Sequence, residues 1–174
     1  MKITVAVVLG ALLTAWGLKR HYADARPDDL LWMMAPTARL VSVVSHATFT
    51  WEPGEGYFAR EQLFLIGKAC AGVNFMIAGF LMLVTGFIVH ARSVRSAFGL
   101  LGACLAAGYA AAMIVNTVRI AVAMWLAGHP AVLSAFAGAE VHRVEGVVVY
   151  FGGLVGLYEV ARWLERHALR GLRS

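Results

Sequence analysis

The stretch from residue 71 to residue 90, AGVNFMIAGFLMLVTGFIVH, is apolar and contains no Asp, Glu, Lys or Arg. A helix of about twenty residues rises about 30 Å, which matches the hydrocarbon layer of a bilayer. Soluble domains carry about 25% charged residues, whereas this chain has 14% charged and 60% hydrophobic residues. The sequence therefore predicts an integral membrane protein.

Three further apolar segments predict membrane-spanning helices. Residues 3–18 form a first span, which we expect to be retained because no small-residue cleavage site follows it. Residues 97–118 and 144–164 form the third and fourth spans. We therefore expect an all-α fold, a multi-pass transmembrane helix bundle with about four spans, built as one membrane domain over residues 1–174.

The segment from residue 19 to residue 70 is expected to lie outside the membrane core. Residues 19–61 mix five basic and six acidic residues, which a lipid-exposed span does not tolerate. Within this segment, residues 30–51 are apolar but interrupted by a proline, an arginine and a histidine. We expect an interfacial or re-entrant helical segment there, and the sequence leaves open whether it spans instead. The Gly-rich WEPGEGY motif at 51–57 predicts a turn.

The arginines of the short loops indicate the orientation. Arg92 and Arg95 lie in the turn between the second and third spans, and four more arginines follow residue 161. Short loops rich in Lys and Arg face the cytoplasm. Both termini should therefore be cytoplasmic, with segment 19–70 and loop 127–143 on the extracytoplasmic side.

Charge and cysteine content exclude several classes of function. The net charge of +5 comes from basic residues spread between apolar segments, so we expect membrane lipids as partners and no nucleic acid. The two cysteines, Cys70 and Cys104, form no CxxC pair and are too few for a disulfide framework. We expect no cofactor and no metal.

Topology brings three chemically active residues to one side of the membrane. Cys70 directly precedes the second span, and His142 directly precedes the fourth. Arg119 lies 22 residues beyond Ala97, or about 33 Å along a helix that starts on the cytoplasmic side. All three are therefore expected at the extracytoplasmic face.

These residue types suit acyl transfer. A cysteine at a helix start gains thiolate stabilisation, a histidine can move the protons, and an arginine can stabilise an oxyanion. Lys68 adds positive charge near Cys70, and Asn116 lies at i, i+3 from Arg119, where it can orient the guanidinium. Lys68, Asn74 and Asn116 are candidate supporting residues, as helpers or as structural groups.

Other interpretations stay open. Cys104, deep in the third span, is expected to be a packing residue. In a non-catalytic scaffold or small transporter, Arg119 and His142 would line a polar path and Cys70 would be dispensable. A thiol redox function is disfavoured because Cys104 should lie too deep to reach Cys70.

At these residues the sequence resembles the exosortase/archaeosortase family of membrane cysteine transpeptidases. The motifs are KACAGVNFM around Cys70, NTVRI ending at Arg119 with its N-x-x-R spacing, and HRVEGVVVYFGG from His142. The order Cys, Arg, His matches the family, and the resemblance covers roughly residues 60–155. The chain is shorter than most exosortases, has Lys68 where many members carry an acid, and looks most like the compact exosortase K form.

The resemblance implies an activity and a substrate class. The enzyme would sit in a bacterial or archaeal cytoplasmic membrane and act on exported proteins with a C-terminal sorting signal. That signal comprises a short motif, a hydrophobic helix and a basic tail. The resemblance also implies catalytic residues Cys70, Arg119 and His142, a thioester on Cys70, and its transfer to water or another acceptor. The recognition motif, the acceptor and the oligomeric state do not follow from the sequence.

Overall fold

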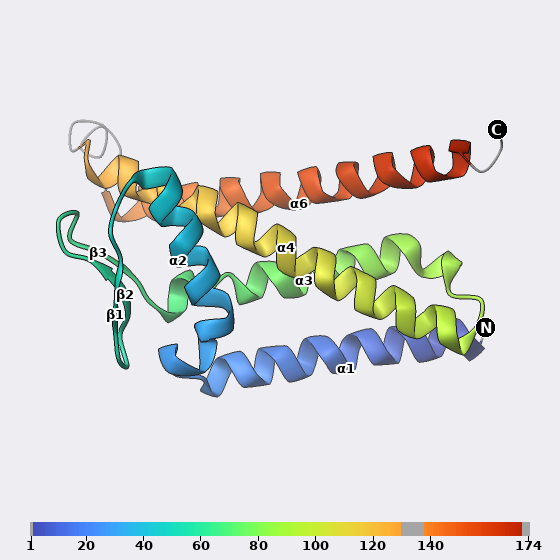
Figure 1. The fold of residues 1–174 in the computed structure, drawn as a ribbon. Coiled ribbons are helices and arrows are strands. Elements are labelled where there is room, and N and C mark those ends of the chain that lie inside the picture. The colour runs from blue at the N-terminus through green and yellow to red at the C-terminus, as the bar shows by residue number, and fades with distance from the viewer. Residues whose placement is uncertain (1, 130–137, 172–174) are drawn as a thin grey trace.

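Four long helices run roughly along one axis and form a bundle (Figure 1). The structure is a computed structural model that describes residues 2–129 and 138–171, with side chains for residues 2–129 and 144–167. The long helices are α1 (Lys2–Asp24), α3 (Val73–Phe87), α4 (Val94–Ala127) and α6 (Gly138–Gly171). Short 3-10 turns flank α3, η2 (Lys68–Cys70) before it and η3 (Ile88–His90) after it.

Each of the four helices, α3 together with its flanking turns, is long and apolar enough to cross a membrane. The prediction of an all-α, multi-pass transmembrane bundle is therefore confirmed. The start of α1 and the end of α6 lie at the same end of the bundle (Figure 1), as an even number of antiparallel spans requires.

Helices α1, α4 and α6 extend beyond the expected spans, whereas α3 is shorter than the expected 71–90 and short 3-10 turns complete its length. Helix α1 continues past residue 18 to Asp24, and its last turn carries an ion pair between Arg20 Nε and Asp24 Oδ2 at 3.2 Å. Helix α4 reaches Ala127, and α6 begins at Gly138, within the segment expected to be a loop. A helix can continue beyond an apolar stretch where its polar side chains reach water or pair within the helix.

A short helix packs across the bundle between α1 and the sheet described below. A 3-10 turn, η1 (Pro27–Leu30), leads into α2 (Leu31–Ser45), which lies across α4 in Figure 1. Pro36 lies inside α2, and the helix ends at His46, whose φ of 54° is left-handed. The inner face of α2 is buried in the bundle through Met33, Met34 and Val41. The helical segment expected within residues 30–51 is thus a 15-residue helix.

A small antiparallel sheet follows α2 at the end of the bundle opposite the termini (Figure 1). Its strands are β1 (Thr50–Glu52), β2 (Gly56–Ala59) and β3 (Phe64–Ile66), in the order β1-β2-β3. The expected turn joins β1 to β2. Gly56 has a φ of 134°, and a Cβ there would collide with the Ile66 carbonyl oxygen. The sheet, which the sequence did not predict, leads directly into Cys70.

Helices α3 and α4 approach closely at Gly108. A Cβ at this position would lie 3.2 Å from both the Met76 carbonyl oxygen and the Phe80 nitrogen, which are backbone atoms that cannot rotate away. Membrane helices use small residues in this way to bring their backbones together. The α3–α4 contact matters for function because α3 starts beside Cys70 and α4 carries Arg119.

Replacing Gly108 with valine should therefore destabilise the bundle. Overpacking costs about 1–3 kcal/mol, and we expect Gly108→Val to lower the free energy of unfolding by about that amount. Gly102→Val is the matched control, because it lies in the same helix and a Cβ there meets nothing within 4 Å. Thermal unfolding in detergent compares the two variants, and equal melting temperatures would contradict the close-contact explanation.

Candidate active site

Cys70 lies at the end of a tight turn that connects the sheet to α3. The Cys70 amide donates to the Gly67 carbonyl at 2.9 Å, which closes the 3-10 turn η2. Gly72 follows with a φ of 75° and is the N-cap of α3. The thiol is free and half-buried. Cys70 is thus positioned by backbone geometry just before the helix, where the sequence motif suggested it.

The backbone at Cys70 is fastened to α4 by Asn116. This side chain is completely buried, and its Nδ2 donates to the Cys70 carbonyl oxygen. A Cβ at Gly72 would lie 3.1 Å from Asn116 Cγ, so a larger residue would push the turn away from α4. The glycine two residues after the cysteine therefore serves both the left-handed φ and this close approach.

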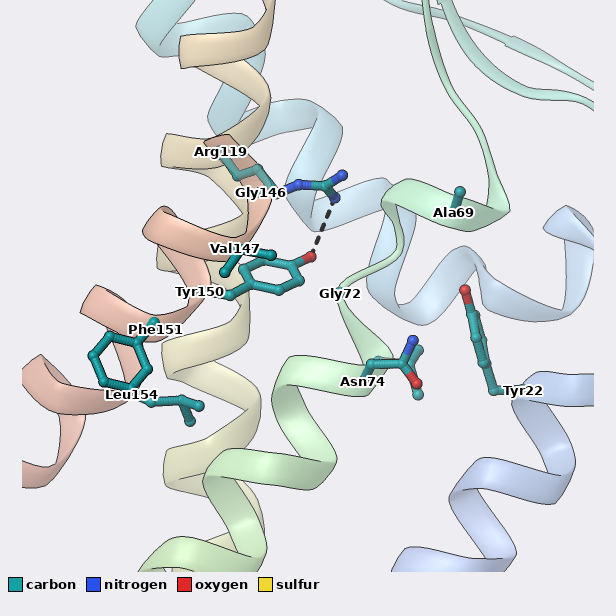
Figure 2. A pocket seen from close by; sticks show the side chains of 11 residues that line it. Tyr22, Ala69, Gly72, Asn74, Arg119, Gly146, Val147, Tyr150, Phe151 and Leu154 are labelled. Atoms are coloured by element: carbon teal, nitrogen blue, oxygen red, sulfur yellow. Dashed lines mark hydrogen bonds between the residues drawn. The ribbon is translucent and has the colours of Figure 1, made fainter. Parts of the chain in front are cut away.

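Arg119 lies one turn further along α4 and joins the same group of hydrogen bonds through Tyr150 of α6. Its Nη1 donates to Tyr150 Oη at 3.3 Å (Figure 2). Tyr150 Oη in turn donates to Asn116 Oδ1 at 3.0 Å. We call Cys70, Asn116, Arg119 and Tyr150 the Tyr150 network. It links the turn before α3 to both α4 and α6.

The guanidinium packs closely against its neighbours and keeps one donor without a partner among the described residues. Its Cζ lies 5.1 Å from the centre of the Tyr150 ring, a cation–π distance. A Cβ at Gly146 would lie 3.2 Å from Arg119 Nε, so a larger residue there would require the arginine side chain to shift. Among the described residues, Nε is buried without a hydrogen-bond partner. Arg119 therefore retains donor capacity beyond the Tyr150 network.

Charges in this region are close enough to influence one another. Burial is the largest influence on a thiolate at Cys70 and opposes it, the positive charge of Arg119 favours it, and Glu145 opposes it. Glu145 is adjacent to Gly146 in α6 and also interacts with Arg119. The site therefore combines a cysteine, an arginine and a carboxylate within electrostatic range of each other.

A pocket of about 480 Å³ opens beside the network. Arg119 and Tyr150 line one side of it, and Asn74 and Tyr22 face them from α3 and α1 (Figure 2). The remaining wall is largely apolar and comprises Ala69, Gly72, Val73, Gly146, Val147, Phe151 and Leu154. The pocket thus offers hydrogen-bonding groups together with an apolar surface, as sites for extended organic ligands do.

The Cys70 side chain also contacts apolar residues. It packs against the cluster formed by Ala38, Val41, Ile66 and Ile120, while its neighbours Ala69 and Gly72 line the pocket. The thiol therefore lies between an apolar cluster and the charged groups of the network.

Lys68 and Asn74 are tied to α1. Lys68 Nζ donates to the Ala23 carbonyl at 3.0 Å, and Lys19 Nζ donates to Asn74 Oδ1 at 2.7 Å. Tyr22 Oη donates to the Lys68 carbonyl at 3.3 Å. These bonds fix the end of α1 against the turn that carries Cys70, which is a structural contribution, and Asn74 also reaches the pocket.

The His142 side chain lies outside the described residues. Its backbone belongs to α6, in which Gly146 and Tyr150 follow at four-residue intervals. Residues four apart share a helix face, so the position of His142 is on the face whose later residues meet Arg119.

Tyr150 and Tyr22 are site residues that the sequence interpretation did not name, whereas Gly146 is the early glycine of the HRVEGVVVYFGG motif. The spacing His142, Gly146, Tyr150 was a usable signal, because a glycine and a tyrosine follow the candidate histidine on one face of an apolar helix.

Cys104 is remote from this site. It is buried in α4 against Phe80 and Leu83, and it precedes Asn116 by twelve residues, or about 18 Å of helix. A disulfide requires Cα atoms within about 7 Å, so Cys104 is a packing residue and not a partner for Cys70.

No family model, curated protein or solved structure matches the chain. Within residues 2–129 and 138–171, His, Cys, Asp and Glu side chains form no group of three that could hold a metal. The function is therefore inferred from the residues of this site and from the sequence motifs that contain them.

Proposed function

We propose that the protein is a membrane-embedded cysteine peptidase/transpeptidase of the exosortase type. The observation that carries the proposal is the Tyr150 network, in which a free cysteine and a half-buried arginine are held by one pair of hydrogen-bonded side chains, Asn116 and Tyr150. An arginine inside an apolar helix is costly and is typically retained for function. Its proximity to a thiol supports acyl-transfer chemistry.

Each of the three residues has a distinct role in the proposed reaction. The Cys70 thiol passes its proton to His142, and the sulfur attacks the scissile carbonyl carbon, so that a C–S bond forms. Arg119 stabilises the oxyanion that develops on the carbonyl oxygen. His142 then gives the proton to the leaving amine as the C–N bond breaks, which leaves a thioester. Water or an acceptor nucleophile attacks the thioester and releases the Cys70 thiol.

The substrates in this proposal are exported proteins that end in a short motif, a hydrophobic helix and a basic tail. The apolar part of the pocket, with Val147, Phe151 and Leu154 from α6, supports binding of an apolar segment next to polar groups. Cleavage releases the helix and tail and leaves the exported part on Cys70.

The arrangement of the bundle supports an extracytoplasmic site. The connection between η3 and α4, which contains Arg92, lies at the same end as the two termini (Figure 1). The sheet and η2 lie at the other end. If basic short loops face the cytoplasm, the site faces the opposite side of a bacterial or archaeal cytoplasmic membrane.

Capture of the thioester tests this proposal directly. The probe is an exported host protein with an apolar C-terminal helix and a basic tail, co-expressed with the enzyme. We expect intact-mass analysis to find the exported part attached to Cys70, and hydroxylamine to release it, because thioesters are cleaved by that nucleophile. If the substrate is cleaved but no adduct forms on Cys70, the result contradicts a thioester mechanism.

The apolar contacts of the Cys70 side chain favour a second candidate, a non-catalytic scaffold or small transporter. In that case Arg119 and His142 line a polar path, and Cys70 is only a packing residue. This candidate predicts that the host protein keeps its C-terminal helix whether or not the chain is present.

A further inference from the structure

Tyr150 is the residue at which the hydrogen bonds of the site converge. We propose that Tyr150 is a positioning residue, whose hydroxyl fixes Asn116 and Arg119 together and thereby sets Cys70 relative to the guanidinium. Its effect on catalysis rests on the proposed function, whereas its effect on the Cys70 thiol does not.

The Tyr150 hydroxyl has a single proton to donate. That proton is donated to Asn116 Oδ1 at 3.0 Å, which leaves an oxygen lone pair for Arg119 Nη1 at 3.3 Å. Because Arg119 is a donor only, the hydroxyl cannot turn its proton toward it. The direction of both hydrogen bonds is therefore fixed by the arginine.

The orientation of the Asn116 amide follows from these bonds. With Oδ1 committed to Tyr150, Nδ2 faces the Cys70 carbonyl and donates to it. A flipped amide would place Oδ1 against that carbonyl, where two acceptors would repel each other. Asn116 is fully buried, so the amide depends on these protein partners. The Tyr150 hydroxyl thus determines how the turn containing Cys70 is fastened to α4.

The ring of Tyr150 and its hydroxyl make different contacts. The ring packs against Phe75, with centroids 5.4 Å apart, and lies under the Arg119 guanidinium. A phenylalanine at position 150 keeps both contacts and removes only the hydroxyl. Tyr150→Phe is therefore a selective test of positioning, and it leaves the packing of α6 on α3 intact.

The experiment measures the reactivity of the Cys70 thiol. Alkylation by iodoacetamide is followed by intact mass across a pH series, in purified protein carrying Cys104→Ala so that one thiol remains. Tyr158→Phe is the matched control, because Tyr158 lies two turns further along α6 and is exposed. Melting temperatures of all variants are recorded alongside the alkylation rates.

We expect Tyr150→Phe to slow alkylation at neutral pH about tenfold, the size of a lost buried hydrogen bond, and to move the profile to higher pH. Among the described residues, the titratable or charged groups near Cys70 are Arg119, Glu145, Tyr22 and Tyr150, together with Lys68 of the same turn, whose Nζ is held by the Ala23 carbonyl. Arg119 is the cation that the Tyr150 hydroxyl holds, so a guanidinium that is no longer held in place stabilises the thiolate less. Tyr158→Phe should leave the profile unchanged.

A double variant tests whether Asn116 and Tyr150 act through one another. Residues in one network are not additive, so Asn116→Ala combined with Tyr150→Phe should be no slower than the slower single variant. An unchanged profile in Tyr150→Phe, or additive slowing in the double variant, would overturn the proposal. Failure to capture a thioester would remove the proposed function and leave this alkylation test standing.

Discussion

Cys70→Ala and Cys70→Ser are each expected to abolish processing of a co-expressed exported protein that ends in an apolar helix and a basic tail. Without the thiol there is no thioester, and a serine hydroxyl is far less acidic than a thiol and therefore a much weaker nucleophile at this site. We expect processing to fall by about a thousandfold or more, as when a catalytic nucleophile is removed. Mass spectrometry of the C-terminus of the exported protein measures this.

Cys104→Ala is the matched control for these variants. It removes a thiol from the buried cluster with Phe80 and Leu83, far from the Tyr150 network, so processing should stay near the wild-type rate. Membrane fractions should contain all three variants in similar amounts, since Cys70 is only half-buried. Full processing by Cys70→Ala would end the cysteine-peptidase proposal and favour the scaffold or transporter.

The helices of the fold were predictable because the membrane imposes a length and a composition on them. The predicted segments 71–90 and 144–164 fall within candidate spans of 23 and 24 residues. Their ends were less predictable, because polar residues such as Lys19 and Arg20 can continue a helix beyond the apolar stretch. Helix ends therefore depend on local pairing and not on hydropathy.

The small sheet was missed for a different reason. Its strands have only three or four residues each, too few for the alternation of apolar and polar residues that identifies a strand. The sequence did show the turn between β1 and β2. The sheet also requires Gly56 of β2 to lie close to the Ile66 carbonyl of β3, and this contact between two strands is not visible in the local sequence.

For the site, the sequence predicted candidate reactive residues but not all of the side chains that bond to them. Cys70, Asn116 and Arg119 stood out as polar or reactive residues at the ends of apolar helices, and the structure joins them in one network. Tyr150 did not stand out, because a tyrosine in an apolar helix is ordinarily interfacial. Only the packing of α6 on α4 gives its hydroxyl two partners.

Arg119→Met should reduce processing by about 100-fold to 1,000-fold, the cost of losing one oxyanion donor. Methionine fills a similar volume without a donor, so the Tyr150 hydroxyl loses Nη1 and the pocket loses its cation. The loss should appear mainly in kcat, because an oxyanion forms only in the transition state. Initial rates with detergent-solubilised enzyme and a range of substrate concentrations separate kcat from KM.

Arg119→Lys distinguishes the effect of the positive charge at position 119 from the effect of the guanidinium's planar shape. An ammonium keeps the positive charge but lacks the planar fork of the guanidinium, so it cannot donate to Tyr150 and retain the free donor at Nε in the same geometry. We therefore expect an intermediate rate, above Arg119→Met and below the wild type. A lysine variant with the wild-type rate would show that charge alone suffices and that the Arg119–Tyr150 bond is dispensable.

The membrane insertion of the Arg119→Met variant shows whether a loss of activity comes from the site or from folding. An arginine costs about 2.5–3.5 kcal/mol at the centre of a membrane helix and less near the interface, where Arg119 is expected, so methionine should let α4 insert at least as well as the native residue. A fall in activity with unchanged or higher membrane yield would then come from the site and not from folding. Arg95→Met is the matched control, because Arg95 is an exposed arginine in the first turn of the same helix. Near-normal processing by Arg119→Met would contradict a role for this side chain in the reaction.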